Sequence, residues 1–158
     1  MGYIRKMWVY RLSKTKYLDT SFSGEGARIA GGRWNNKGNA CVYSSLSEAQ
    51  AILEVLVHLQ NDAPLDAYSF TRIKLEEDDV AVLPEAHWPA SWNVETGSLD
   101  ARRLGDGWLK SNDSLALLVP SVFTRHEKNC LINPNHPDLK SRLESVETWP
   151  YSFDDRLV

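Results

Sequence analysis

Residues 45–60, SLSEAQAILEVLVHLQ, constrain the fold more strongly than any other segment of the chain. The spacing of Ser45 and Glu48 is that of a capping box, which predicts that a helix begins there. Apolar residues cover most of the circumference of this helix, and only a narrow stripe is polar. Such a helix must be central to the fold, with its polar stripe facing solvent or lining a cleft. The stripe consists of Ser47, Gln50, Glu54 and His58.

Most of the other apolar segments carry the branched and aromatic residues that are typical of strands. They predict strands at residues 6–12, 40–45, 67–75, 79–83, 114–121 and 129–134, with a terminal strand within 143–158. Residues 13–38 and 85–95 are expected to be irregular, and residues 98–111 to form a helix broken by two glycines. Because strands dominate and helices do not alternate with them, we expect an α+β fold. It should be a single compact domain spanning residues 1–158, mostly strands with a central helix.

The composition argues against several functional classes. The formal net charge is −3 and no run of Lys and Arg stands out, so a basic face for direct nucleic-acid binding is not expected. With only 2 cysteines a disulfide framework is not expected, and the apolar surroundings of Cys41 and Cys130 predict buried free thiols. The N-terminus has no signal-peptide pattern, and no segment has the apolar length of a membrane span. A cytoplasmic location without membrane contact is therefore expected.

The familiar catalytic signatures do not fit this chain. The segment GEGARIAG begins like a dinucleotide-binding fingerprint, but Ile29 occupies the third glycine position and no apolar strand precedes it. There is no Walker loop, and the 4 histidines lack metal-ligand spacing, so no metal site is expected. Ser121, in VPSVF, lacks the flanking glycines of a nucleophile elbow.

What remains is a set of polar residues at the edges of apolar segments. Arg33 lies in the glycine-rich stretch GGRWNNKG, and Tyr43 lies near the end of a predicted strand. Glu54 is on the polar stripe of the helix, and Ser121 follows a strand and a proline. Each has an ordinary structural explanation: a solvated arginine, a core tyrosine, a surface ion pair of Glu54 with His58, and a turn serine. The spacing of these residues leaves the choice open.

In their order along the chain and in their local sequence, several segments together resemble the RES domain family, which is named for its arginine, glutamate and serine. They are YR on the first strand, GGRWNNKG, VYSS, the alanine- and glutamate-bearing helix, GDGWL, VPS, LINPNHPD and FDDRL. The resemblance implies a compact fold similar to that of ADP-ribosyltransferases. It also implies a toxin of a bacterial toxin–antitoxin pair that degrades NAD by phosphorolysis or hydrolysis. The implied partner is an antitoxin with an Xre-like helix-turn-helix domain, whose C-terminal part covers the active site.

The same resemblance assigns residues to this activity. The expected catalytic residues are Glu54, Arg33, Tyr43 and Ser121. The expected NAD-binding residues are Arg33, Tyr43, Trp34, Asn35 and, as a weaker carry-over from the YR pair, Arg11. No cofactor is expected, because NAD is the substrate, and inorganic phosphate is a second substrate if the reaction is phosphorolysis.

The chemistry of NAD cleavage suits these residue types. Nicotinamide leaves as a neutral ring, so no general acid is required, and one carboxylate, Glu54, suffices to stabilise the oxocarbenium-like sugar. Arg33 offers a planar fork to the diphosphate, and its neighbouring glycines let backbone N–H groups approach the same phosphates. Tyr43 would stack on nicotinamide or ribose, and Ser121 would orient the substrate or the acceptor. A phosphate subsite is expected to draw on Arg11, Arg28 and Lys37.

Two other functions stay open at this point. An ADP-ribosyltransferase that modifies one host protein would use the same site with a different acceptor. A non-catalytic interaction module would instead use its tryptophans, of which the chain has 6, because aromatic residues are enriched at interfaces. The acceptor (phosphate, water or protein), the identity of the antitoxin and the formation of a homodimer are not determined by the sequence.

Overall fold

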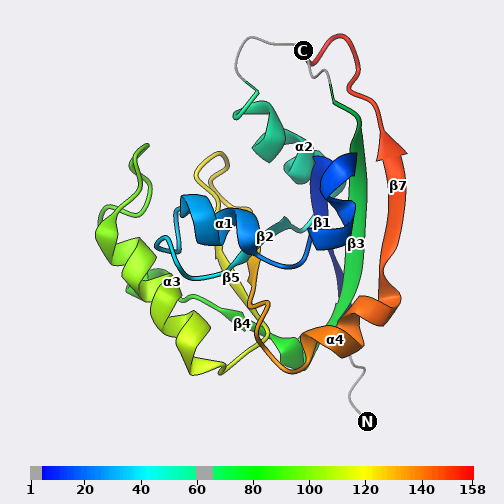
Figure 1. Cartoon of the computed structure of the whole chain (residues 1–158). Coiled ribbons are helices and arrows are strands. Elements are labelled where there is room, and N and C mark those ends of the chain that lie inside the picture. The colour runs from blue at the N-terminus through cyan, green and yellow to red at the C-terminus, as the bar shows by residue number, and fades with distance from the viewer. Residues whose placement is uncertain (1–4, 60–65) are drawn as a thin grey trace.

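The chain forms one mixed sheet of 7 strands in the order β4-β5-β6-β2-β1-β3-β7, in a computed structural model that describes residues 5–59 and 66–158 (Figure 1). The strands are β1 (Lys6–Lys14), β2 (Val42–Ser45), β3 (Tyr68–Glu76), β4 (Val80–Val82), β5 (Ala116–Pro120), β6 (Lys128–Ile132) and β7 (Glu147–Tyr151). The helices are α1 (Glu25–Ala30), α2 (Glu48–Leu56), α3 (Leu99–Ser111) and α4 (Leu139–Arg142), with 3-10 turns at Thr15–Thr20, Glu77–Asp79, Glu85–His87 and Leu143–Ser145.

Most neighbouring strands are antiparallel. β4 and β5 are parallel, and the crossover between them contains α3, as a parallel connection requires. The predicted single compact α+β domain with few helices is confirmed, and its architecture is consistent with an ADP-ribosyltransferase-like fold.

The sheet has a seam between its two central strands. β1 pairs with β3 along its whole length, whereas β1 and β2 are in register only at Tyr10↔Ser45. β2 pairs instead with β6, over Val42–Ser45. The sheet therefore has two halves, β1-β3-β7 and β4-β5-β6-β2. They separate on one side of the Tyr10–Ser45 pair, and this separation leaves room for side chains between them.

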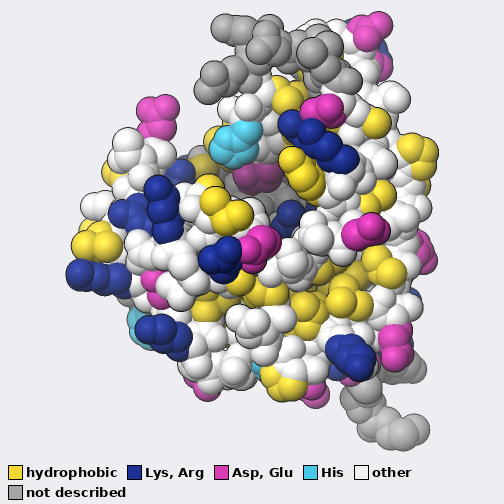
Figure 2. Space-filling model, viewed as in Figure 1, with side chains coloured by type: hydrophobic (Ala, Val, Ile, Leu, Met, Phe, Trp, Pro, Cys, Tyr) yellow, Lys and Arg dark blue, Asp and Glu magenta, His cyan; other side chains and the backbone are white. Residues whose placement is uncertain are grey.

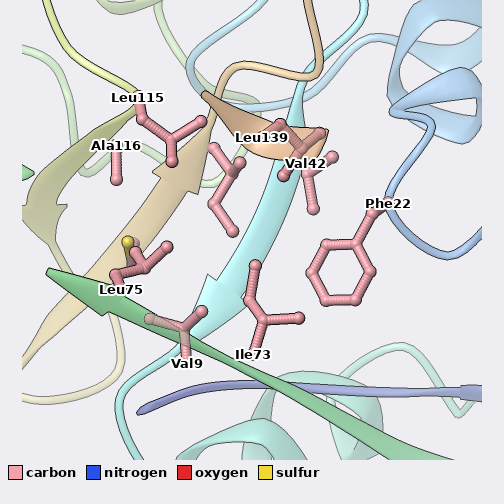
Figure 3. Close-up of a cluster of buried hydrophobic side chains, with 10 residues drawn as sticks. Val9, Phe22, Val42, Ile73, Leu75, Leu115, Ala116 and Leu139 are labelled. Atoms are coloured by element: carbon pink, nitrogen blue, oxygen red, sulfur yellow. The ribbon is translucent and has the colours of Figure 1, made fainter. Parts of the chain in front are cut away.

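One buried cluster holds the two halves together across the seam (Figure 3). Val9 and Ile73 are register partners on β1 and β3, and Val42 and Ile132 are register partners on β2 and β6. Phe22, from the connection after β1, packs into the same cluster. Removal of each large aliphatic side chain from water stabilises the fold by about 1.5–3 kcal/mol.

Two further clusters attach the longer helices to the sheet. α3 packs Ala101 and Leu109 against strands β5 and β6, and Trp34 of the glycine-rich stretch belongs to the same cluster. α2 packs Ala51 against Leu12 of β1, together with aromatic residues of β3 and β7. Because α2 contacts both central strands, β1 and β2, it has the central position that its apolar circumference predicts.

α2 begins later than its capping pattern predicts. Its N-cap is Ser47, whose Oγ accepts a hydrogen bond from the Gln50 N–H at 3.1 Å. Ser45, the predicted start, is instead the last residue of β2. Both serines have capping chemistry, and the pairing of Ser45 with Asn129 on β6 decides between them. The helix ends at Leu56, before the predicted end at residue 60, which itself lies outside the described residues.

α3 is continuous, although its two interior glycines predict a break. A Cβ on Gly105 would lie 1.6 Å from the carbonyl oxygen of Trp34, so the glycine permits close approach of the helix to the glycine-rich stretch. Gly107 has nothing within 4 Å of the equivalent position. The contacts of this helix with the sheet outweigh the propensity cost of about 1 kcal/mol for each glycine.

The segment after β1 is more ordered than the irregular connection predicted for it. It contains a 3-10 turn and the six-residue helix α1, which is bounded by Gly24 with φ 71° and Gly31 with φ 74°. A helix this short has too few residues to show an apolar stripe, so periodicity could not reveal it.

Cys41 and Cys130 are buried free thiols, as predicted. Burial raises the pKa of each thiol to about 12, so neither is a reactive thiolate at neutral pH. Among the described residues, no helix has the length and apolarity that a membrane span requires.

Candidate active site

A cavity of about 810 Å³ lies where the glycine-rich loop, residues 31–38, faces α2. Its other walls come from α1, the connection before α3 and the segment after β5. Figure 2 shows the hollow near the middle of the face viewed in Figure 1, with an acidic and a basic side chain deep inside it. The volume is in the range of pockets that hold drug-sized ligands.

Tyr43 anchors the glycine-rich loop. Its hydroxyl donates to Asn35 Oδ1 at 2.6 Å and accepts from the Trp34 N–H at 3.0 Å. Gly32 permits this contact, because a Cβ there would lie 2.5 Å from the Tyr43 hydroxyl. Asn35 is 0% exposed, and its Nδ2 also donates to two backbone carbonyls at 2.9 Å. Burial raises the pKa of Tyr43 above its ordinary value, so the phenol remains a hydrogen-bond donor at neutral pH.

α3 holds the same loop from the other side. Asp106 accepts from the Asn36 N–H at 3.0 Å and from Asn36 Nδ2 at 2.7 Å. Arg102 Nε donates to Asn36 Oδ1 at 3.2 Å, and Gly105 lies against the backbone of Trp34. The loop is therefore a preorganised structure rather than a free connection.

Arg33 links this loop to the connection before α3. Its Nη1 donates to the carbonyls of Trp92 and Val94, both at 2.7 Å. Nε and Nη2 make no hydrogen bond to the described part of the chain. Because both backbone bonds use the same nitrogen, the other edge of the planar guanidinium stays free to bind a phosphate in a bidentate manner.

Glu54 lies on the polar stripe of α2 and lines the cavity. Its Oε1 accepts a hydrogen bond from Asn129 Nδ2 at 2.9 Å. No ion pair joins Glu54 to His58 within residues 5–59 and 66–158, and both side chains line the cavity. Two residues of the polar stripe, Glu54 and His58, therefore line a cleft, whereas Gln50 is buried and Ser47 is exposed.

Arg11 is a partly buried cation in the seam between β1 and β2. Its Nη1 donates to the carbonyl of Tyr43 at 2.8 Å, and its Nε is shielded from solvent without a hydrogen-bond partner in the part of the chain that the structure describes. Burial lowers the pKa of Arg11 to about 10. A pocket of about 110 Å³ beside Arg11 is also lined by Glu54 and Asn129. No carboxylate pairs with Arg11 among the described residues, and a buried charge with a perturbed pKa in a pocket is a candidate for a functional site.

The structure brings together most, but not all, of the predicted site residues. Arg33, Trp34, Tyr43 and Glu54 line the same cavity, although Trp34 is only 2% exposed. Ser121 and the fully buried Asn35 do not line it, and Arg11 lines the adjoining small pocket instead. Ser121 is 4% exposed, its Oγ accepts from the Phe123 N–H at 3.2 Å, and it lines a neighbouring cavity of about 720 Å³.

The three cations predicted for a phosphate subsite have different surroundings. Arg28 is exposed on α1 and is paired with the carboxylate of Glu25 through Nε at 2.9 Å. Lys37 is exposed and lines neither the main cavity nor the small pocket. Arg11 alone among the three adjoins the pocket that Glu54 lines.

Several residues of the cavity were missed by sequence reasoning. Asn129 lies on β6, Lys14 and Tyr68 lie at the paired ends of β1 and β3, and Phe123 follows β5. Lys14 forms an ion pair with Asp66 at 3.0 Å. A polar residue inside an apolar strand, as in KNCLI, is a signal for Asn129, but it does not tell which element the side chain meets.

Comparison with known proteins shows to which family this chain belongs. The model of the RES domain family matches residues 9–154. A protein named "Toxin Res" from Yersinia enterocolitica is 37% identical over 151 residues, which cover 96% of this chain and 99% of that protein. A "Toxin Res" from Photorhabdus laumondii is 34% identical over 152 residues, covering 96% and 97%. A "Prs ADP-ribosylating toxin" from a Sphingobium species is 36% identical over 156 residues, covering 96% and 95%. The chain therefore belongs to the RES domain family.

Proposed function

We propose that this protein is a toxin that depletes cellular NAD by cleaving the bond between nicotinamide and ribose. The observation that carries the proposal is that one carboxylate, Glu54, shares a cavity with Arg33 and an adjoining pocket with Arg11. An anionic group beside two cations suits a substrate that combines a diphosphate with a sugar that becomes cationic during reaction. Relatives named as toxins support the same reading.

In the proposed reaction, the bond between ribose C1′ and the nicotinamide nitrogen breaks, and the electron pair stays on that nitrogen. Nicotinamide leaves as a neutral ring, so the site needs no general acid. Glu54 stabilises the positive charge that develops on the sugar and accepts hydrogen bonds from its hydroxyl groups. The free edge of the Arg33 guanidinium holds the diphosphate of NAD.

Arg11 is proposed to hold the acceptor when the acceptor is phosphate. The pocket beside Arg11 adjoins Glu54, so a phosphate bound there would lie close to the reacting sugar. Attack by a phosphate oxygen on C1′ forms the new C–O bond and yields ADP-ribose phosphate, while attack by water in the same place yields ADP-ribose and releases a proton to solvent. Ser121 lines the neighbouring cavity rather than the main one and carries no catalytic step in this scheme.

A second candidate function is transfer of ADP-ribose to a side chain of one host protein. The observation that favours it is the 36% identity to a protein named "Prs ADP-ribosylating toxin". The same Glu54 and Arg33 would serve this reaction, and only the acceptor would differ. Labelled NAD incubated with lysate separates the two functions, because transfer to a protein leaves label on a discrete band.

We further propose that the toxin acts in the cytoplasm and is neutralised by an antitoxin with an Xre-like helix-turn-helix domain. In this proposal the antitoxin covers the cavity between the glycine-rich loop and α2. Co-purification from cells, followed by mass spectrometry, would identify the partner. Addition of that partner is expected to stop NAD turnover.

The direct test is release of nicotinamide from NAD by the purified chain, with and without phosphate. Glu54→Gln is expected to lower the rate on the order of 10²–10³-fold, because the carboxylate charge is removed at a preorganised site. Glu48→Gln, an exposed residue at the start of the same helix, is the matched control and is expected to remain active. No release from the folded native chain in either buffer would refute the proposal.

A further inference from the structure

A short series of hydrogen bonds leads from the backbone of β6 to the carboxylate of Glu54. Gln50 Nε2 donates to the carbonyl of Lys128 at 2.9 Å and to Asn129 Oδ1 at 2.6 Å. Asn129 Nδ2 then donates to Glu54 Oε1 at 2.9 Å. Gln50 is 5% exposed, so water competes little with these bonds. We call Gln50, Asn129 and Glu54 the amide relay.

The orientation of the two amide groups in the relay is determined by the first acceptor, the backbone carbonyl of Lys128. A backbone carbonyl can only accept, so the nitrogen of the Gln50 amide must face Lys128, and its second N–H meets the oxygen of Asn129. Gln50 Oε1 then accepts from the Leu46 N–H at 3.4 Å. Asn129 must therefore present its NH₂ group to Glu54, and this arrangement suits an ionised carboxylate, which only accepts.

The relay is held by two rigid elements. Gln50 and Glu54 are four residues apart on α2 and therefore lie on one side of the helix. Asn129 is on the inner strand β6, in register with Ser45 of β2 and Val119 of β5. Asn129 also lines both the main cavity and the small pocket beside Arg11. Its amide is therefore placed at the junction of the two spaces that the proposed reaction uses.

From this geometry we propose that Asn129 is a positioning residue for Glu54, and that Gln50 supports Asn129. By occupying Oε1, Asn129 holds the carboxylate against rotation and leaves Oε2 as the oxygen that meets the ribose. Oε2 accepts no hydrogen bond from any residue that the structure describes. The inference rests on the proposed function, in which Glu54 stabilises the cationic sugar.

Two substitutions of Asn129 separate positioning from packing. Asn129→Ala removes the donor, whereas Asn129→Asp keeps the shape of the side chain and still accepts from Gln50. The aspartate, however, cannot donate to Glu54 when ionised, and it brings a like charge beside it. We expect kcat to fall about 10- to 100-fold for Asn129→Ala and further for Asn129→Asp, with KM for NAD changed by less than about threefold. A packing role predicts the opposite order, because the aspartate fills the space.

A third variant tests the supporting residue without touching either end of the contact. Gln50→Met keeps the length of the side chain but donates to neither Lys128 nor Asn129, and a loss of kcat smaller than that of Asn129→Ala is expected. Asn135→Asp adds the same charge at an exposed position that lines neither the main cavity nor the small pocket beside Arg11, and it should leave kcat unchanged. Thermal melting of each variant excludes loss of the fold as the cause.

The outcomes distinguish this inference from the proposed function. If the native chain cleaves NAD and folded Asn129→Asp is as active as the native chain, the positioning role is wrong and the function stands. If the native chain does not cleave NAD, growth arrest on expression replaces turnover as the readout. Arrest that weakens in the order native, Asn129→Ala, Asn129→Asp would support the positioning of Glu54 for a different reaction. Arrest that is equal for all three chains would overturn it.

Discussion

At the scale of single residues, the hydroxyl of Tyr43 has a structural task besides the stacking expected of its ring. It joins Asn35 Oδ1 and the Trp34 N–H, which both belong to the glycine-rich loop. Tyr43→Phe keeps the ring and leaves these two groups without a partner. We expect the free energy of unfolding to fall by about 1–3 kcal/mol, and the KM for NAD to rise because the loop loses its anchor. Urea denaturation and steady-state kinetics measure the two effects.

A different result would assign Tyr43 another role. If Tyr43→Phe has native stability and native KM while Tyr43→Leu loses activity, stacking by the ring is the whole contribution of this residue.

Arg11 is the residue at which an anion is most strongly expected. Its guanidinium is shielded in the seam, its Nε has no partner among the described residues, and burial lowers its pKa to about 10. A ligand that binds only the folded state raises the melting temperature. We therefore expect phosphate to raise the melting temperature of the native chain, and to have little effect on Arg11→Met.

The matched control for this experiment is Arg28→Met, which removes an exposed arginine that is already paired with Glu25. Its melting temperature should rise with phosphate as much as that of the native chain. An equal response of Arg11→Met and the native chain would contradict a phosphate site at Arg11.

Some residues of the site were predicted from the sequence, and others were not. Arg33, Tyr43 and Glu54 lie in short segments that resemble the motifs of the RES domain family, and all three line the cavity. Asn129 and Gln50 were not predicted as site residues, because their contact joins a helix to a strand about 80 positions away, a distance that helical or strand periodicity does not span. Ser121 was predicted from its motif, but it lines the neighbouring cavity, and its Oγ accepts a hydrogen bond from the Phe123 N–H.

At the scale of elements, the two glycines of α3 have opposite roles, and this provides a direct prediction. Gly105→Ala would place a Cβ 1.6 Å from the Trp34 carbonyl oxygen, so the helix or the loop must move. We expect a loss of about 1–3 kcal/mol in the free energy of unfolding, or more, and a weaker affinity for NAD.

Gly107→Ala is the matched control on the same helix. Nothing lies within 4 Å of the added Cβ, and alanine has the better helix propensity by about 1 kcal/mol. This variant should be more stable than the native chain by roughly that amount in urea denaturation. If both substitutions shifted stability equally, the close contact of Gly105 with the loop would not be the reason for its presence.

The helix boundaries show how far local patterns reach. The apolar stripe of α2 predicted the helix and its central place, because periodicity is a property of the sequence alone. The predicted start of α2 was wrong, because Ser45 and Ser47 both have capping chemistry. Only the pairing of Ser45 with β6 excludes Ser45 as the N-cap. The predicted break in α3 was wrong for the same reason: packing against the sheet and the loop outweighs a local preference.

At the scale of the whole molecule, Arg33 couples the glycine-rich loop to the connection before α3. Its Nη1 holds the carbonyls of Trp92 and Val94, so Arg33→Met would release that connection. Two hydrogen bonds from a charged donor are lost, and each typically contributes about 1.5–3 kcal/mol. We expect the amides of Trp92, Val94 and Gly97 to exchange at least about tenfold faster with deuterium than in the native chain.

The control for this exchange experiment is Arg103→Met, which removes an exposed arginine of α3 without hydrogen bonds to the described residues. Its exchange in the same connection should match that of the native chain. If Arg33→Met also exchanged at the native rate, the two backbone bonds would not be what orders this wall of the cavity.

The sequence by itself determined the α+β class, the central helix, the buried thiols and the arginine, tyrosine and glutamate that line the cavity. These depend on residue type, on periodicity along one segment, or on motifs that stay within a few residues of each other. The tertiary structure decided the seam between β1 and β2, the position of Arg11 within it, the placement of Ser121 at the neighbouring cavity and the bond from Asn129 to Glu54. Each of these depends on which strands pair and where they separate. Strand pairing joins residues that are distant in sequence, so it is determined by the packing of the whole chain rather than by any one segment.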